Sequence, residues 1–202
     1  MSVRVETLDG GAIAAVLDDL AALRITVFRE WPYLYDGDAG YERAYLAEFA
    51  AAPNAALVVA RDGARIVGAA TASPMTAQKA QFRAPFEERG IDTAALFYFG
   101  ESVLLPDWRG QGIGKAFFDH REAAARAAGA LKASFCAVER PLDHPARPAD
   151  YRPLDGFWRA RGYAPVPGFV TEFPWRDLGD EEETLHPMQY WLGDIVAVPV
   201  QG

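Results

Sequence analysis

Three glycines lie between an apolar stretch and an alanine-rich stretch, and this junction most constrains the fold. Residues 96–105 are apolar and aromatic, which predicts a buried strand. Residues 115–129 are alanine-rich and predict a helix. A helix that begins directly after such a turn presents unpaired backbone N–H groups and the positive end of its dipole, which together capture phosphate. Glycine suits the turn because a side chain would keep the backbone from approaching an anion closely.

The spacing of the glycines excludes two familiar nucleotide-binding loops. A dinucleotide loop reads G-x-G-x-x-G, and its third glycine would fall one residue beyond Gly114. A P-loop requires a glycine where Arg109 stands, and a serine or threonine where Ala116 follows Lys115. The run that is present reads R-G-x-G-x-G, preceded by an apolar strand and Pro106. Its arginine adds a forked cation for a phosphate ligand.

This run resembles the pyrophosphate loop of the GNAT superfamily of N-acetyltransferases, whose core pattern is Q/R-x-x-G-x-G/A. Arg109, Gly112 and Gly114 match that pattern, and Leu104 and Pro106 stand in the usual places upstream. The alternative is a glycine-rich turn that only ends a strand. The resemblance implies acetyl-CoA as cofactor.

The order of the expected elements implies one domain, residues 1–202, of α/β class. It matches the acyl-CoA N-acyltransferase (GNAT) fold, a mixed twisted sheet with helices on both faces. The expected elements are a strand at 3–8, helices at 13–29 and about 41–49, strands at 56–60 and 65–73, an irregular connection at 75–94 with one helical turn at 85–89, a strand at 96–105, a helix at 115–129, a strand at 131–138, a helix at 154–161, strands at 169–175 and 188–192, and a tail from 194.

Composition and charge exclude several classes of function. The formal net charge of −8 and the lack of a basic stripe argue against a nucleic-acid partner. No signal-peptide apolar region and no apolar run of membrane length occur, so we expect a cytoplasmic protein without a membrane partner. The single cysteine, Cys136, lies in an apolar strand and predicts a core thiol rather than a nucleophile. The three histidines lack metal-ligand spacing, so no metal is expected, and a homodimer is left open.

The resemblance assigns the cofactor to the loop and to the strand before it. In this family the central strand parts from its neighbour, and backbone groups near its end bind the pantetheine arm. The cofactor-binding residues it implies are Val103, Leu104, Arg109, Gly110, Gln111, Gly112, Ile113, Gly114 and Lys115.

Glu101 is the candidate catalytic base. It is the only ionisable residue inside the otherwise apolar strand at 96–105, and such a carboxylate is either desolvated or directed toward a substrate cleft. A glutamate on this strand often acts as base in the family. The alternative is a strand glutamate paired with an arginine.

The family's usual acid is missing. Many relatives carry a tyrosine in a Y-x-x-x-G-F/Y run, and here that position is Trp158, followed by Gly162 and Tyr163. An indole N–H supplies no proton at neutral pH, so Trp158 is expected to pack. Tyr151 is a substitute acid, and unaided departure of the thiolate is another solution.

An aromatic, acidic loop at residues 30–40 is the candidate acceptor site. Trp31, Tyr33 and Tyr35 alternate there with carboxylates, which predicts a pocket for a cationic or aromatic amine. The alternative is a packed connection between two helices. In the family, the two helices after the first strand cover the acceptor side.

The sequence therefore predicts an N-acetyltransferase that moves the acetyl group of acetyl-CoA to an amine of a small molecule by direct attack on the thioester. One alternative is a non-catalytic acyl-CoA-binding sensor or interaction domain. Another is a protein or peptide N-acetyltransferase, which requires an open groove. The loop at 30–40 and the long connection at 75–94 favour a covered pocket instead.

Overall fold

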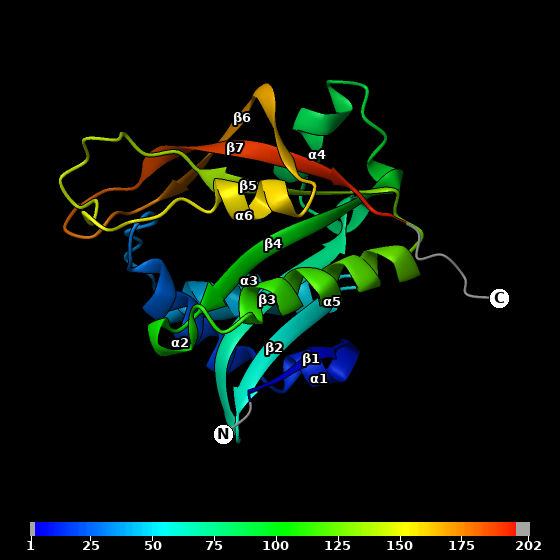
Figure 1. Ribbon diagram of the computed structural model, residues 1–202, viewed down its shortest axis with the longest axis horizontal. Helices are drawn as coiled ribbons and strands as arrows, with labels where there is room; N and C mark the ends of the chain where they lie inside the picture. The colour runs from blue at the N-terminus through cyan, green and yellow to red at the C-terminus, as the bar shows by residue number, and fades with distance from the viewer. Residues whose placement is uncertain (1–2, 197–202) are drawn as a thin grey trace.

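The computed structural model describes residues 3–196, which form one seven-stranded mixed sheet with helices on both faces (Figure 1). The strand order is β1-β2-β3-β4-β5-β7-β6, and only β4 and β5 pair in parallel. The strands are β1 (Arg4–Leu8), β2 (Ala56–Asp62), β3 (Arg65–Pro74), β4 (Leu96–Leu104), β5 (Lys132–Val138), β6 (Ala164–Trp175) and β7 (Thr184–Asp194). The mixed sheet expected from the sequence is confirmed.

Six α-helices lie in the described range. They are α1 (Gly10–Ala14), α2 (Leu17–Phe28), α3 (Ala39–Ala51), α4 (Ala80–Glu87), α5 (Ile113–Ala127) and α6 (Asp155–Ala160). Three single 3-10 turns accompany them: η1 (Met75–Ala77), η2 (Thr93–Ala95) and η3 (Pro106–Trp108). No helix among residues 3–196 is both long enough and apolar enough to cross a membrane.

Four apolar clusters hold the helices to the sheet, two on each face. Helices α1, α2 and α3 bury one cluster against β2, β3 and β4, and α5 buries a second on the opposite side of β2 and β3. Helices α5 and α6, on the near side of the sheet in Figure 1, share an aromatic cluster with β4, β5 and β7. Helix α4 packs against β4, β6 and β7. The core therefore covers both faces around β4.

Strands β4 and β5 separate after a short paired stretch. Their register contains only three pairs, of which Tyr98↔Ser134 is the last. Both strands continue beyond it, β4 to Leu104 and β5 to Val138. Their ribbons diverge visibly in Figure 1. The separation forms a wedge in the middle of the sheet, with its vertex beside Tyr98.

A β-bulge lies in β4 at the same place. Ala70 pairs with Ser102 and Ala72 with Phe99, so Gly100 and Glu101 together oppose Thr71 alone. Glycine is required here, because a Cβ at residue 100 would lie 2.3 Å from Thr71 Oγ1. The extra residue reverses the alternation of faces. Phe97 and Phe99 pack with α5 and α6, whereas Val103 packs with α1–α3.

Several boundaries differ from the sequence expectations. The helix expected at 13–29 is broken into α1 and α2, because Val16 leaves helical geometry with φ −120° and ψ 12°. The turn expected at 85–89 is part of the longer helix α4, which contains Pro85. Strand β6 begins at Ala164 rather than 169, with an irregularity between Pro165 and Val170. Most of the expected tail from 194 lies outside the described residues. The spacing of apolar residues does not show where a helix is interrupted or where a strand begins, so it could not predict these differences.

Candidate active site

A cleft of about 1440 Å³ occupies the wedge between β4 and β5. Its walls come from both strands, from the end of α2 and the loop after it, from the start of α5, and from the segment 139–155 with α6. The sheet provides the floor and the loops provide the rim. Chain segments far apart in sequence therefore meet around one cavity.

The glycine-rich loop forms an open cradle at the start of α5. Gly110 and Gly112 have left-handed φ values of 73° and 82°, which a side chain disfavours. The first main-chain bond of the helix runs from Ala116 N to Gly112 O, at 3.1 Å. The amides of residues 113–115 therefore point past the helix end. A Cβ at Gly110, Gly112 or Gly114 would meet no heavy atom within 4 Å. Free amides and open space fit a pyrophosphate.

The side chain of Arg109 connects the glycine-rich loop to the end of β4 and to Glu30, which follows α2. Its Nε donates to Leu104 O at 3.0 Å, and its Nη2 lies 2.8 Å from Glu30 Oε2 at the end of α2. Arg109, Gly110, Gly114 and Leu104 all line the cleft. Within the loop, the Gln111 side chain donates to Asp107 O at 2.9 Å. As the structure stands, Arg109 stabilises the loop through two protein contacts.

The end of β4 presents Leu104 to the cleft, as the sequence suggested, and Ser102 in place of Val103. Leu105 N donates to Val67 O on β3 at 3.0 Å. Successive peptide groups alternate sides, so the main chain of Val103 also faces β3, whereas those of Ser102 and Leu104 face the wedge. Val103 is buried in the cluster with α1–α3. Ser102 lines the cleft and was missed, because the bulge that sets the register leaves no periodic signal.

Glu101 lines the cleft from the α2 side and forms an ion pair with Arg24. The glutamate side chain is 6% exposed, and Arg24 also pairs through Nε with the fully buried Glu42. Burial alone would lower the pKa of Arg24, but the charges of Glu101, Tyr45 and Glu42 outweigh it and raise that pKa. Arg24 therefore stays charged. The alternative expected from the sequence, a strand glutamate paired with an arginine, matches the contact between Arg24 and Oε1 of Glu101.

Cys136 and Tyr98 face each other at the vertex of the wedge. The Tyr98 hydroxyl lies 3.0 Å from Cys136 Sγ. Burial raises the pKa of the Cys136 thiol to about 12 and raises that of Tyr98 well above its usual value. Both groups therefore stay protonated at neutral pH, so Cys136 provides no thiolate nucleophile.

Trp158 packs in the aromatic cluster of α6. Its ring centre lies 5.1 Å from that of Phe135 and 5.0 Å from that of Trp191. Tyr151, the substitute acid suggested by the sequence, lines the cleft. Burial raises the pKa of the Tyr151 hydroxyl, so this hydroxyl keeps its proton at neutral pH.

Aromatic contacts between two loops close one end of the cleft. The Trp31 ring centre lies 5.0 Å from that of His144 and 6.0 Å from that of Tyr151, across the cleft rim. Tyr33 also lines the cleft, and burial above all raises the pKa of its hydroxyl.

Tyr35 lies outside the cleft, packed against the cluster with α1–α3. The carboxylates of the same loop have structural partners. Asp36 pairs with Arg29 at 3.3 Å and with Arg176 at 2.7 Å. Asp38 accepts a hydrogen bond from Tyr41 N at 2.8 Å and caps α3. Of the three aromatic residues predicted in this loop, Trp31 and Tyr33 therefore line the cleft and Tyr35 does not.

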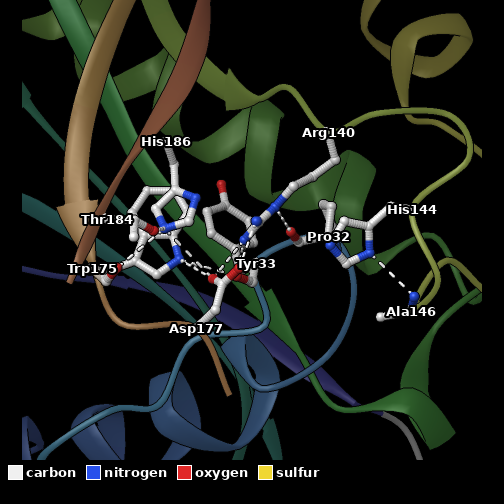
Figure 2. A network of polar contacts seen from close by, with 9 residues as sticks. All are labelled: Pro32, Tyr33, Arg140, His144, Ala146, Trp175, Asp177, Thr184 and His186. Atoms are coloured by element: carbon white, nitrogen blue, oxygen red, sulfur yellow. Dashed lines mark hydrogen bonds and ion pairs between the residues drawn. The ribbon is translucent and has the colours of Figure 1, made fainter. Parts of the chain in front are cut away.

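Arg140 joins the rim of the cleft in a single buried network (Figure 2). Its Nη1 and Nη2 donate to the two carboxylate oxygens of Asp177, each at 2.7 Å. Its Nε donates to Pro32 O at 2.9 Å, and Nη2 donates also to Tyr33 O at 2.7 Å. Trp175 Nε1 donates to Asp177 at 3.0 Å. No sequence pattern indicates this network, because its partners lie far apart in the chain.

Comparisons with known proteins agree with this geometry. Residues 20–149 match the family model described as Acetyltransferase (GNAT) family. No curated protein matches the sequence. A solved aminoglycoside 6'-N-acetyltransferase complexed with coenzyme A is 16% identical, with a TM-score of 0.61 over 97% of this chain and 99% of that one. A putative GNAT acetyltransferase from Desulfovibrio desulfuricans is 14% identical, with a TM-score of 0.60 over 96% and 100%. The PaiA N-acetyltransferase of Thermoplasma acidophilum, in complex with coenzyme A, is 12% identical, with a TM-score of 0.54 over 96% and 99%.

Proposed function

Because this chain belongs to the acetyltransferase (GNAT) family, whose acetyl donor is acetyl-CoA, we propose that its acceptor is an amine of a small molecule that attacks the thioester directly. The family establishes an acetyl-CoA-dependent enzyme. The acceptor class and the roles of individual residues in the cleft are our proposal.

The glycine-rich loop is proposed to hold the pyrophosphate of the donor. The amides of residues 113–115 point out of the helix end, and the dipole of α5 favours an anion there. The main chains of Ser102 and Leu104 face the wedge and would bind the pantetheine arm. An N–H of the bulge would stabilise the oxyanion that develops on the thioester carbonyl.

The closed rim is the observation that favours a small-molecule acceptor. The ring of Trp31 packs against His144 and Tyr151 on the opposite loop. Arg140 donates hydrogen bonds both to Pro32 O, next to Trp31, and to Asp177. A peptide groove would need this end to be open. One structural relative is, by its name, an N-acetyltransferase of aminoglycosides, which is in keeping with an amine acceptor here.

Glu101 is proposed as the base that takes the proton of the attacking amine. It lines the cleft beside the bulge, and its Oε1 contacts Arg24 Nη1. Positioned general bases contribute on the order of 10²–10⁴ in rate. Glu42 is a matched control, because it contacts the same arginine but is fully buried outside the cleft lining.

A thiol assay with acetyl-CoA and a panel of small amines tests the proposal. We expect amine-dependent release of free CoA, with kcat/KM lowered by about 10²–10⁴ in Glu101→Gln and nearly unchanged in Glu42→Gln. Equal losses in both variants would assign Glu101 a structural role. CoA binding without release for any amine would indicate the non-catalytic acyl-CoA-binding alternative. Faster turnover of peptide amines would indicate a protein acetyltransferase.

A further inference from the structure

Arg121 is a buried cation without a counterion. It projects from α5 with 2% of its surface exposed and is among the largest fully buried side chains. Its guanidinium lies 4.6 Å from the ring centres of both Phe99 and Phe118. Its Nε has no hydrogen-bond partner among residues 3–196, and no carboxylate within that range pairs with it.

Three other arginines that are buried or half-buried are all paired. Arg24 contacts Glu42 and Glu101, Arg140 contacts Asp177, and Arg161 contacts Asp119 and Glu122. A buried charge without a partner is costly, and aromatic faces offset only part of that cost. Desolvation lowers the pKa of Arg121 to about 10, with Arg161 acting in the same direction and Tyr163, Glu101 and Glu122 in the opposite one, so Arg121 is still a cation at neutral pH. An unpaired cation of this kind points to an anionic ligand group.

The position of Arg121 identifies which group that is. Arg121 lines the cleft, and it lies over Phe99, the residue directly after the last β4–β5 pair at Tyr98. It therefore marks the vertex of the wedge on the α5 face. Seven residues separate it from Gly114, which places it roughly 10 Å along the helix from the pyrophosphate cradle. A donor held at the cradle would extend its sulfur end toward this vertex.

We propose that Arg121 stabilises the sulfur of CoA as a thiolate, the charge that forms when the acetyl group leaves. This inference rests on the proposed function. In that transfer a C–N bond forms and the C–S bond breaks, and the electron pair of the broken bond stays on sulfur. The amine proton goes to the base, and Arg121 keeps its own proton. A cation at the sulfur removes the need for the acid that Trp158 cannot supply.

Proton release on CoA binding tests the inference without turnover. A free cysteine thiol has a pKa of about 8.5, and the alkyl thiol of CoA is less acidic still, so CoA bound as thiolate at pH 7.5 must release a proton. Calorimetry in two buffers of different ionisation enthalpy measures that release. We expect it for the wild type and for Arg121→Lys, but not for Arg121→Met or for desulfo-CoA, the analogue without sulfur. Arg161→Met is the matched control, because it removes a paired arginine from the same aromatic cluster and should still release the proton.

The pH dependence of affinity gives a second measurement on the wild type alone. Thiolate binding predicts that CoA binds about tenfold more tightly at pH 8.5 than at pH 7, relative to desulfo-CoA, if the bound thiol titrates about two pH units below the free one. Equal pH dependence for the two ligands, or undiminished proton release in a folded Arg121→Met, would overturn the inference and leave the proposed function standing. A wild type that binds neither ligand would overturn the proposed function, and the inference with it.

Discussion

At the scale of single residues, Cys136 and Tyr98 are two protonated groups that do not take part in the proposed chemistry. Cys136 is the only cysteine in the chain, and its thiol lies 3.0 Å from the Tyr98 hydroxyl. Burial raises the pKa of Cys136 to about 12 from an ordinary value of 9.0. The reactivity of this thiol therefore measures how well the vertex of the wedge is shielded from solvent.

Alkylation of Cys136 should be strongly suppressed in the folded protein. At pH 8.5 we expect iodoacetamide to react at least about a hundredfold more slowly with the native chain than with the chain in urea, because only the thiolate reacts. The raised pKa also means that the unfolded state loses its proton first, so stability falls as pH rises from about 9 toward 12. Similar native and unfolded rates at pH 8.5 would show that the thiol is accessible and ionised.

At the scale of elements, the bulge in β4 decides which side chains meet. Without it, strict alternation would place Glu101 on the α5 face with Phe97 and Phe99. With it, Glu101 faces α2 and Arg24, while Arg121 reaches the opposite face. The proposed base and the proposed thiolate site therefore lie on opposite sides of β4.

A double-mutant cycle tests the bulge. Gly100→Ala would bring its Cβ to 2.3 Å from Thr71 Oγ1, so we expect loss of both stability and turnover. Adding Thr71→Ala removes that oxygen, and the next nearest atom, Thr71 Cβ, lies at 3.6 Å. The double variant should therefore be more stable than Gly100→Ala alone in urea unfolding. Simple additivity of the two changes would argue against this contact.

The sequence predicted the loop, the following helix and most of the element order, because these depend on local glycine spacing and apolar periodicity. It allowed that Glu101 pairs with an arginine but did not identify Arg24 as the partner, since one extra residue in a strand changes the face without changing the pattern. It also placed Tyr35 in the acceptor pocket, whereas Tyr35 packs into the core. Arg121 was overlooked because an arginine among helical residues carries no sign of being unpaired.

At the scale of the whole molecule, the Arg140 network joins three segments around the cleft. Arg140 follows β5, Pro32 and Tyr33 follow α2, and Asp177 follows β6. The loop after α2 is further held by Leu178 N, which donates to Leu34 O at 2.7 Å. This end of the cleft is thus held to the segment between β6 and β7.

Breaking this network should cost more stability than breaking a surface pair. Asp177→Asn leaves the buried Arg140 charge without its carboxylate, and we expect a loss of about 3–5 kcal/mol in the free energy of unfolding. Asp36→Asn removes an exposed partner of Arg176 and should cost about 1 kcal/mol or less. Urea unfolding measures both. If both variants lost only about 1 kcal/mol or less in the free energy of unfolding, the Arg140 network would not stabilise the rim of the cleft.

On our proposal, the amides at the start of α5 hold the donor's pyrophosphate. Gly114 tests it without backbone strain, since its φ is not left-handed and a Cβ there meets nothing within 4 Å. Gly156, which opens α6 outside the cleft lining, has the same properties and serves as the control site.

The measurement is the affinity for CoA by calorimetry in Gly114→Asp, Gly114→Ala and Gly156→Asp, each checked for folding. We predict that Gly114→Asp binds CoA at least about tenfold more weakly than the wild type, because its carboxylate would oppose the pyrophosphate at the helix end. Gly114→Ala should weaken binding less, and Gly156→Asp should bind as the wild type does. Wild-type CoA affinity in a folded Gly114→Asp would contradict the claim.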